Sequence, residues 1–388
     1  MRVKIESFLR EVCEKTTKNN EYPVLTSSKS GLFLQSDYFN KQVASTDNTG
    51  YKIIKKGQFT YRAMSDTGEF YPNMLECVDV GIVSPAYPVF EIFQTDIIIP
   101  EYLKYYFKSN AFQHAISSFA QGSTRTSVKF NKLKTASIDL PSKQEQTKIL
   151  RLLKKAETLI ACRQQELHKL DDLVKARFVE MFGNLETNEK CWIEKPLGEL
   201  CEKVIRYPTF YGMDYLASGT RVIRIGNILE DGHMDIDNAN YVFVYDNVNN
   251  DYPETVIELF DIVMAVRGDG SAAKRIGIIR EKSLVGANIS PNLIRIKAAD
   301  SMMHPVYLFY YLTGEVGQKR LDAYVNKTAK KNIAAKDIVK VIVPTPPKDL
   351  QQDFADFVQQ IDKSKFVVQQ ALDKAQLFFD SLMQQYFG

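Results

Sequence analysis

The segment "PEYLKYYF" at residues 100–107 returns as "PVYLFYYL" at residues 305–312. The two segments lie 305 − 100 = 205 positions apart. The same offset aligns residues 100–183 with residues 305–388, and no gap is needed. Both aligned stretches finish on the same dipeptide, Phe-Gly. A fixed register over this length indicates two copies of one unit, rather than two helices that share a composition by chance.

Upstream of these segments the offset drifts, as insertions in loops would cause. The segment "VSPAY" at 83–87 matches "ISPNL" at 289–293, although little around either segment is shared. The segment "LREVCEK" at 9–15 matches "LGELCEK" at 197–203. The repeat therefore extends over nearly the whole chain, with a framework that is kept and intervening parts that differ.

The composition is that of a soluble globular protein with two or more domains. The chain has 388 residues, of which 45% are hydrophobic and 25% are charged. It has neither a signal peptide nor an apolar run long enough to cross a membrane, so we expect a cytoplasmic protein. The formal net charge is only +3, so a nucleic-acid surface must consist of local basic patches.

The five cysteines are an odd number, without a CxxC pair, and the four histidines are scattered. This pattern indicates reduced thiols and predicts no disulfide framework and no metal site.

Each copy reads as a mixed domain followed by one long helix. Short apolar runs broken by Gly, Asn, Asp and Pro predict strands and turns in the first part, together with short helical stretches. We therefore predict an α+β fold of two repeated mixed α/β domains. The predicted boundaries are 1–141 and 185–346 for the two mixed domains, and 142–184 and 347–388 for the two helices.

The ends of the long helices carry capping signals. Ser142 and Glu145 form a capping box before the first helix, and Gly183 is its predicted C-cap. In the second copy, Thr345 followed by Pro346 predicts an N-cap and a proline in the first turn.

Apolar residues in both helices step by alternating intervals of four and three, which predicts a coiled-coil seam. The seam positions are Ile149, Leu153, Ala156, Ile160, Arg163, Leu167, Leu170, Val174, Arg177 and Met181 in the first helix, and Phe354, Val358, Ile361, Lys365, Val368, Leu372, Ala375, Phe379, Leu382 and Tyr386 in the second. Each seam buries its apolar residues most simply against the other, in an antiparallel pair with pseudo-twofold symmetry. The polar members Arg163, Arg177 and Lys365 either fix the register or extend their charged ends into water. A second apolar face also repeats, with the pairs Leu152/Phe357, Leu173/Phe378, Phe178/Met383 and Phe182/Phe387. Part of this face must pack on the mixed domains, and the rest could receive a partner.

Catalytic motifs are scarce. Gly268-x-Gly270-x-x-Ala273 matches the dinucleotide fingerprint, but the following "RIGIIRE" reads as a strand. A β-hairpin with a Gly-rich turn is therefore the better interpretation. The sequence contains no phosphate-binding GxxxxGK[ST] loop and no arguable Ser/His/Asp or Cys/His set. We predict no catalytic residue, no metal and no cofactor in this chain.

A polar basic loop recurs at matched positions, "QGSTRTSVKFNKLK" at 121–134 and "NKTAKKNIAAKDIVK" at 326–340. Each runs into a residue that could cap a helix, Ser127 or Asn332. Hydroxyls, cations and exposed helix N–H groups suit phosphate, although a solvated loop has the same composition. The predicted DNA-binding residues are Arg62, Ser123, Thr124, Arg125, Lys129, Arg206, Tyr207, Arg267, Lys274, Arg275, Lys327, Thr328, Lys330 and Lys331.

The double architecture resembles the specificity subunit of type I restriction–modification systems, over the whole chain. The segment "DLPSKQEQTKIL" at 139–150 looks like that family's entry into its first spacer helix, and "VSPAY" looks like a strand of its recognition domain. The second copy departs from the first, because Leu350 stands where the first copy has Glu145.

The resemblance implies a non-catalytic DNA reader. Each target-recognition domain is expected to bind one half of a bipartite, asymmetric site, and the paired helices to set the distance between the halves. The implied partners are double-stranded DNA, two methyltransferase subunits that hold S-adenosylmethionine, and restriction subunits in the full complex. A duplicated coiled-coil scaffold for protein partners, without a DNA role, stays open as the alternative. A self-contained methyltransferase–nuclease is disfavoured by the missing motifs. The sequence specifies neither the bases read nor the length of the gap.

Overall fold

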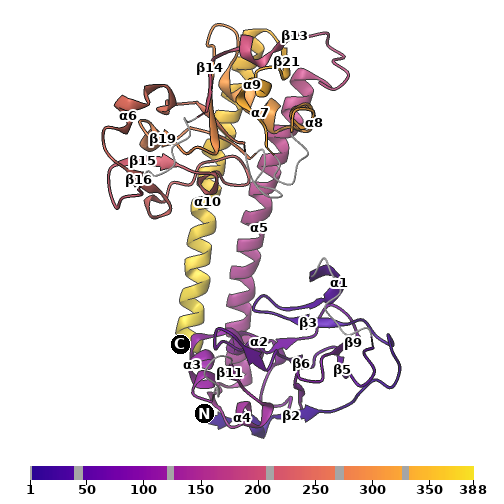
Figure 1. The fold of residues 1–388 in the computed structure, drawn as a ribbon. Helices are drawn as coiled ribbons and strands as arrows, with labels where there is room; N and C mark the ends of the chain where they lie inside the picture. The colour runs from indigo at the N-terminus through magenta and orange to yellow at the C-terminus, as the bar shows by residue number, and fades with distance from the viewer. Residues whose placement is uncertain (1, 39–46, 120–125, 207–213, 267–274, 326–331) are drawn as a thin grey trace. The chain divides into compact units, whose positions relative to one another are not determined.

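The computed structural model describes residues 2–38, 47–119, 126–206, 214–266, 275–325 and 332–388 (Figure 1). The chain divides into two compact units. Unit 1 comprises Met1–Glu166 with Val368–Gly388, and unit 2 comprises Leu167–Val367. Each unit therefore holds one mixed domain together with part of each long helix.

In unit 1 the mixed domain is built from short antiparallel sheets and small helices. The four-stranded sheet has the order β2 (Leu9–Val12), β10 (Val89–Ile92), β6 (Phe59–Thr60) and β8 (Asn73–Met74). The two-stranded sheets are β1 (Arg2–Lys4) with β12 (Ser137–Asp139), β3 (Leu25–Ser27) with β4 (Leu32–Leu34), β5 (Lys52–Lys55) with β9 (Val80–Val83), and β7 (Met64–Ser65) with β11 (Thr126–Ser127). The helices are α1 (Gln35–Tyr38), α2 (Pro100–Lys108), α3 (Asn110–Ser117) and α4 (Phe130–Leu133), with the 3-10 turn η1 (Ile5–Ser7).

Unit 2 has the same framework around a different insert. Its four-stranded sheet has the order β14 (Cys201–Arg206), β20 (Leu293–Ala298), β17 (Ile262–Ala265) and β18 (Ile276–Ile278). Beside it lie β13 (Ile193–Pro196) with β21 (Ile342–Thr345), and a three-stranded sheet of β16 (Val242–Val244), β15 (Thr220–Ile223) and β19 (Asn288–Ile289). The helices are α6 (Val248–Asp251), α7 (Pro305–Thr313), α8 (Glu315–Asp322) and α9 (Ala335–Ile338). The 3-10 turns are η2 (Leu197–Glu199), η3 (Ile225–Asn227), η4 (Asn238–Asn240), η5 (Pro253–Thr255) and η7 (Lys282–Leu284).

The strand orders confirm the internal repeat. The order β2-β10-β6-β8 in unit 1 corresponds to β14-β20-β17-β18 in unit 2, and the pair β1-β12 corresponds to β13-β21. The tyrosine-rich segments that first indicated the repeat become the equivalent helices α2 and α7, and their faces are buried in the two main cores. The predicted fold class, two repeated mixed domains each followed by a long helix, is confirmed.

The long helices are α5 (Lys143–Phe182) and α10 (Lys348–Phe387), each of 40 residues. In unit 1, Ile149 and Leu153 near the beginning of α5 share an apolar core with Leu382 and Phe387 at the end of α10. In unit 2 the reverse holds, because the end of α5 packs against the beginning of α10; Phe182 lies 5.5 Å from Phe354 between ring centroids. Within each unit the two helices therefore run antiparallel, as the seams predict (Figure 1).

Two of the four predicted capping features are confirmed. The backbone N–H of Ser142 donates to Glu145 Oε2 at 3.1 Å, and the N–H of Glu145 donates to Ser142 Oγ at 3.3 Å. Gly183 ends α5 at φ +75°, which favours glycine. The N-cap predicted at Thr345 and the first-turn proline predicted at Pro346 are wrong. Thr345 is the last residue of β21, where its hydroxyl donates to Ile193 O at 2.6 Å, and α10 begins only at Lys348, beyond Pro346.

The polar residues of the seam behave in two ways. Lys365 forms an ion pair across the helices with Asp171, which can specify register. Arg163 and Arg177 each pair with a glutamate three residues later in their own helix, and Arg177 also lies 5.7 Å from the centroid of the Phe357 ring of α10. Lys365 and Arg177 therefore contact the other helix, whereas Arg163 bonds along its own.

The five cysteines are free thiols. Among the described residues no group of three His, Cys, Asp or Glu side chains could hold a metal ion. Within that same part of the chain, no helix is long and apolar enough to cross a membrane.

Candidate DNA interface

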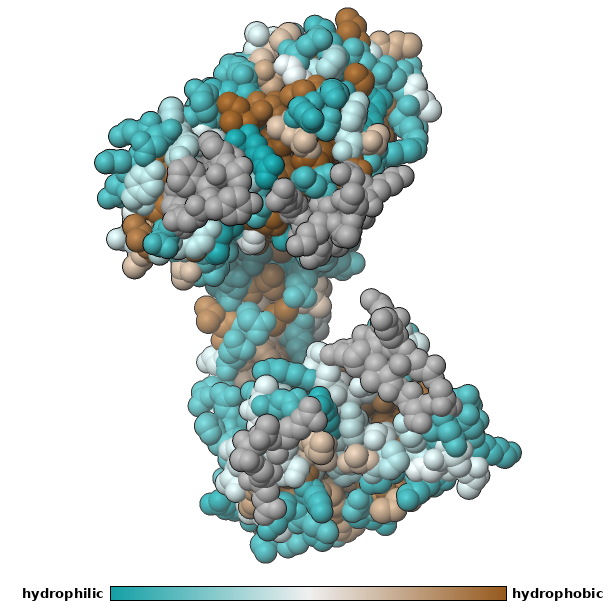
Figure 2. Space-filling model, in the orientation of Figure 1, coloured by the Kyte–Doolittle hydropathy of each residue, from teal (hydrophilic) through white to brown (hydrophobic). Residues whose placement is uncertain are grey.

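Unit 1 contains a polar groove of about 700 Å³. One wall is the β3 strand with the turn that follows it, and the other is the loop of residues 62–71 after β6. The face of unit 1 in Figure 2 is largely hydrophilic, with apolar side chains in small separate patches. The groove is lined by Val24, Leu25, Thr26, Ser27, Ser28, Lys29, Gln35, Tyr51, Arg62, Met64, Ser65, Asp66, Thr67, Glu69, Tyr71, Ser84 and Tyr87.

Cations, carboxylates and an aromatic ring lie together in this groove. Arg62 and Asp66 form a loose ion pair at 3.7 Å, and both side chains are more than half exposed. Lys29 lies 3.5 Å from Glu69 and 5.4 Å from the centroid of the Tyr71 ring. A hydrogen bond to Tyr71, and then the charge of Glu69, raises the pKa of Lys29, so its ammonium stays protonated. Such a set of donors, acceptors and π-faces suits the edges of bases as well as phosphates.

The loop of residues 62–71 is held at both of its ends. Before it, the buried Tyr61 donates its hydroxyl to Val128 O at 2.9 Å, and the N–H of Val128 donates to Ala63 O at 3.0 Å. At the far end, Gln113 of α3 accepts from the N–H of Phe70 at 3.0 Å and donates to Phe70 O at 2.7 Å. Arg62, Asp66 and Glu69 therefore stand on a rigid support, as a reading surface requires.

The predicted helix caps next to the basic loops are wrong. Ser127 belongs to β11, where it pairs with Met64, because the backbone after the first basic loop joins a sheet. The helix α4 begins later and has Lys129 at its N-cap, without a capping side-chain hydrogen bond. In the second copy, α9 has Ala334 at that position, and Asn332 lies in a β-bridge. Lys129 itself is exposed, as a DNA contact requires.

Most of the residues predicted in the basic and glycine-rich loops lie outside the described residues. These are Ser123, Thr124, Arg125, Tyr207, Arg267, Lys274, Lys327, Thr328, Lys330 and Lys331. Their role in DNA binding stays a prediction.

The strands on either side of the glycine-rich motif pair with each other. β17 pairs antiparallel with β18, and Met264 lies opposite Ile276. This pairing confirms the hairpin interpretation, because a strand follows the motif and not the helix that a dinucleotide site needs. The motif itself falls outside the described residues.

In unit 2 the structure describes two of the predicted residues, Arg206 and Arg275. Arg206, at the end of β14, donates from Nε to Pro291 O at 3.1 Å. Pro291 belongs to "ISPNL", the counterpart of the "VSPAY" segment whose Ser84 and Tyr87 line the groove of unit 1. Arg275, just before β18, donates to Ile228 O at 3.2 Å. Arg206 therefore contacts the counterpart of a segment that lines the groove of unit 1.

The sequence-based predictions missed several residues of the groove in unit 1 and two cation–π pairs in unit 2. In unit 1 these are Lys29, Glu69 and Tyr71, which are too far apart in sequence for any local pattern to connect them. In unit 2 the guanidinium of Arg224 lies 5.9 Å from the Tyr215 ring, and that of Arg221 lies 5.0 Å from the Tyr241 ring. Two arginines three residues apart at the end of β15 were a weak signal, because strands often carry exposed cations.

Comparison with known proteins gives the same result for the two halves of the chain. Residues 6–171 and again residues 189–374 match the type I restriction modification DNA specificity domain. The chain is 27% identical over 158 residues to the EcoBI specificity subunit of Escherichia coli, which covers 40% of this chain and 32% of that protein. It is 22% identical over 240 residues to the MjaVIII specificity subunit of Methanocaldococcus jannaschii, which covers 58% of this chain and 55% of that protein. The matches thus span about a third and about half of these relatives.

Two solved structures share the fold over the whole chain. A structure from a study of the assembly and conformational transition of the type I restriction–modification system gives a TM-score of 0.61 at 16% identity, covering 100% of this chain and 97% of that one. The specificity subunit from M. genitalium gives a TM-score of 0.53 at 16% identity, with coverage of 100% and 96%. With two specificity domains, two equivalent mixed folds and two long helices in evidence, the chain belongs to the family of type I restriction–modification specificity subunits.

Proposed function

We propose that this subunit reads a bipartite DNA site, with one recognition domain on each half of the site. The observation that carries this proposal is the repeat itself. Two domains keep one framework around different inserts. The groove of unit 1 presents Arg62 and Lys29 beside carboxylates, whereas unit 2 presents Arg221 and Arg224 against tyrosine rings. Different side chains on one framework favour two half-sites that differ in sequence.

The chain's own part in the reaction is recognition rather than chemistry. It holds the DNA by phosphate contacts and discriminates by base contacts. Methylation belongs to two methyltransferase subunits, which bring S-adenosylmethionine, and restriction subunits complete the assembly on DNA in the cytoplasm. Support for docking of the methyltransferases comes from apolar side chains that stay exposed on the long helices. These are Leu152, Leu159, Leu377 and Phe378 in unit 1, and Leu173, Val179, Phe366 and Val367 in unit 2.

Two recognition modules on a stiff support gain affinity from each other only when both half-sites lie at the spacing that the support allows. We therefore assign the paired helices the role of a spacer. The alternative, a scaffold for proteins alone, leaves the rigidly supported cations and carboxylates of the unit 1 groove without a use.

An exchange of the first domain tests the proposal. Residues 16–140 are replaced by the corresponding domain of another specificity subunit, and the complex with methyltransferase subunits selects from a pool of random duplexes. We expect one half-site to change while the other half and the gap stay the same. A simultaneous change of both half-sites would mean that the domains are not independent readers.

The scaffold alternative is tested with the native chain. The purified methyltransferase complex should retain duplex DNA sequence-specifically, and binding should weaken steeply as salt rises. A complex that forms normally but binds no DNA at any salt concentration would favour the scaffold.

A further inference from the structure

Each mixed domain packs on its own long helix through the same four helix positions. In unit 1 the helix contributes Ile149, Leu150, Leu153 and Ala156 to the core, and in unit 2 it contributes Phe354, Ala355, Val358 and Ile361. Every pair of equivalents differs by the offset of 205. The repeat thus preserves a defined apolar strip. The polar residues at the two ends of this strip are also repeated.

A buried glutamine borders the strip on its N-terminal side. Gln146 accepts from the N–H of Ile99 at 2.9 Å and donates to Ile97 O at 2.8 Å. Its equivalent, Gln351, accepts from the N–H of His304 at 2.8 Å, and both glutamines are 0% exposed. Each glutamine ties the backbone before α2 or α7 to the first turn of the long helix.

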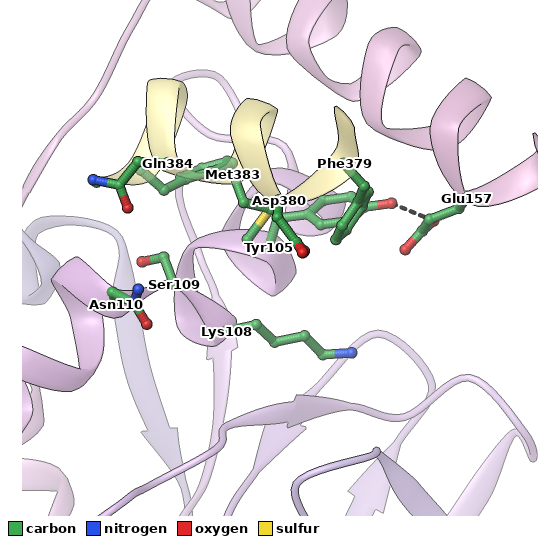
Figure 3. A pocket seen from close by; sticks show the side chains of 11 residues that line it. Tyr105, Lys108, Ser109, Asn110, Glu157, Phe379, Asp380, Met383 and Gln384 are labelled. Atoms are coloured by element: carbon green, nitrogen blue, oxygen red, sulfur yellow. Dashed lines mark hydrogen bonds between the residues drawn. The ribbon is translucent and has the colours of Figure 1, made fainter. Parts of the chain in front are cut away.

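A carboxylate borders the strip on its C-terminal side, one residue after the last core position. In unit 1, Glu157 accepts a hydrogen bond from the Tyr105 hydroxyl of α2 at 2.5 Å (Figure 3). In unit 2 the equivalent residue, Asp362, forms an ion pair with Arg280, which follows β18. Both carboxylates therefore bind a residue of their own domain, although the two donors come from different elements.

The glutamine and the carboxylate of each copy lie on one face of the long helix. Glutamine and carboxylate are 157 − 146 = 362 − 351 = 11 residues apart in each copy. Eleven residues are just over three turns and span about 16 Å along the axis. One attachment point leaves a domain free to swing on an apolar strip, whereas two points at this separation fix its direction along the helix.

The carboxylate bond at the C-terminal end of the strip also has different neighbours in the two units. In unit 1 the Tyr105 ring lies 6.4 Å from that of Phe379 of α10, beside a cavity of about 400 Å³ that Lys108 also lines (Figure 3). Burial, and then the bond to Glu157, raises the pKa of Tyr105, so its hydroxyl keeps the proton that it donates.

In unit 2 the carboxylate tie is ionic and mostly shielded from water. The side chains of Arg280 and Asp362 are 14% and 27% exposed. The guanidinium of Arg280 also lies 3.5 Å from His233 Nε2 and 5.9 Å from the Phe309 ring. The hydrogen bond from His233 holds the pKa of the neighbouring Asp231 at about 2, so this carboxylate is charged as well. Arg280 therefore connects Asp362 of α10 with the turn that carries Asp231 and His233.

We propose that Glu157 and Asp362 are positioning residues that fix the angle of each recognition domain on its spacer helix. Because the domains read separate half-sites, this angle determines which gap between the half-sites both domains can span together. The inference rests on the proposed function and extends it from the length of the spacer to the direction in which each domain leaves it.

Two conservative variants test the positioning role. Tyr105→Phe removes the donor to Glu157 and keeps the ring, and Asp362→Asn removes the charge that binds Arg280 and keeps the shape. The measurement is competition, in the methyltransferase complex, between duplexes with the native gap and with a gap one base pair longer or shorter. We expect a preference of about tenfold for the native gap to fall to about two- or threefold in each variant. The preferred bases in both half-sites should stay the same.

The control is Asp356→Asn, which removes an exposed carboxylate of the same helix whose partner, Gln352, is also in that helix. It should leave the gap preference unchanged. A variant that lowers the melting temperature but keeps the full preference for the native gap would overturn the positioning role, because it would mean that the carboxylate serves stability alone. A change in the bases read would overturn it too. Failure of the unaltered complex to select any two-part site would contradict the proposed function instead.

Discussion

At the scale of single residues, the buried glutamines explain why a polar side chain recurs just before the apolar strip of each long helix. Gln351 has no exposed surface and donates to Pro346 O at 2.8 Å in addition to its bond from His304 N–H. Sequence alignment matched it to Gln146, but its function was not predictable, because the backbone groups that it satisfies are created by the fold.

Replacement of Gln351 by alanine should lower the free energy of unfolding by roughly 1–3 kcal/mol, because buried backbone groups lose their partner. Chemical denaturation checks this value. Gln352→Ala, at the exposed neighbouring position, is the control and should stay within about 0.5 kcal/mol of the native protein. Equal effects of the two substitutions would mean that the buried bonds contribute nothing.

In the groove of unit 1, Arg62 is the residue that we expect to carry discrimination. Arg62→Ala should relax one base position of one half-site, at a cost of about 1–3 kcal/mol in binding to the preferred duplex. Lys56→Ala is the matched control, since Lys56 is an exposed cation with its own carboxylate partner and does not line the groove. If both variants weaken all sequences equally, Arg62 contacts only phosphate, and the slope of binding against salt should then fall by about one.

Protonation distinguishes one cysteine from the others. Burial raises the pKa of the Cys201 thiol to about 12, whereas Cys13 is exposed. Since the thiolate is the reactive form, alkylation of Cys201 in the folded protein should stay slow from about pH 7 to pH 10. Mass spectrometry of iodoacetamide-treated protein checks this, with the unfolded chain as the control. Modification of Cys201 as rapid as that of Cys13 would contradict its protected environment.

At the scale of elements, the sequence specifies the long helices better than the sheets. The capping box at Ser142, the glycine at 183 and the seam of alternating threes and fours are local signals, and the helix α5 follows them. Strand pairing depends on partners far away in sequence, so neither the pairing of β7 with β11 nor the groove beside it could be predicted. The misplaced cap at Thr345 has the same origin, since pairing with β13 competes with helix initiation.

The strand β20 contains an arginine that no local pattern predicts to be buried. Arg295 is 1% exposed and bonds to Asp261 and Glu258 at 2.7 Å each. Despite the arginine, the balance of effects raises the pKa of Asp261, because burial disfavours its charge more strongly. Loss of the arginine partner would therefore leave the buried Asp261 carboxyl unpaired and lower the free energy of unfolding.

Arg295→Met should destabilise unit 2 by about 3–5 kcal/mol, since Asp261 would stay buried without its counter-charge. Thermal or chemical unfolding measures this loss. The double variant Arg295→Met with Asp261→Leu removes both charges and should recover part of the lost stability. No recovery in the double variant would mean that the shape of the arginine, and not its charge, is what matters.

At the scale of the whole molecule, the repeat was the most informative feature of the sequence, because it is a pattern of register and needs no partner to be recognised. It predicted two equivalent domains, two long helices and their antiparallel pairing. The reading surfaces were predictable only in part. Arg62 was predicted from the sequence and lines the groove of unit 1, whereas Lys29 and Tyr71 are brought beside it by contacts that only the fold creates.

The central claim is that the paired helices space two independent readers. The most direct test inserts one helical turn into the middle of both helices, and the methyltransferase complex then selects from random duplexes. One turn adds about 5–6 Å, close to two base pairs of DNA. We expect a gap longer by about two base pairs, with the same bases in both half-sites. An unaltered gap together with altered bases would contradict it.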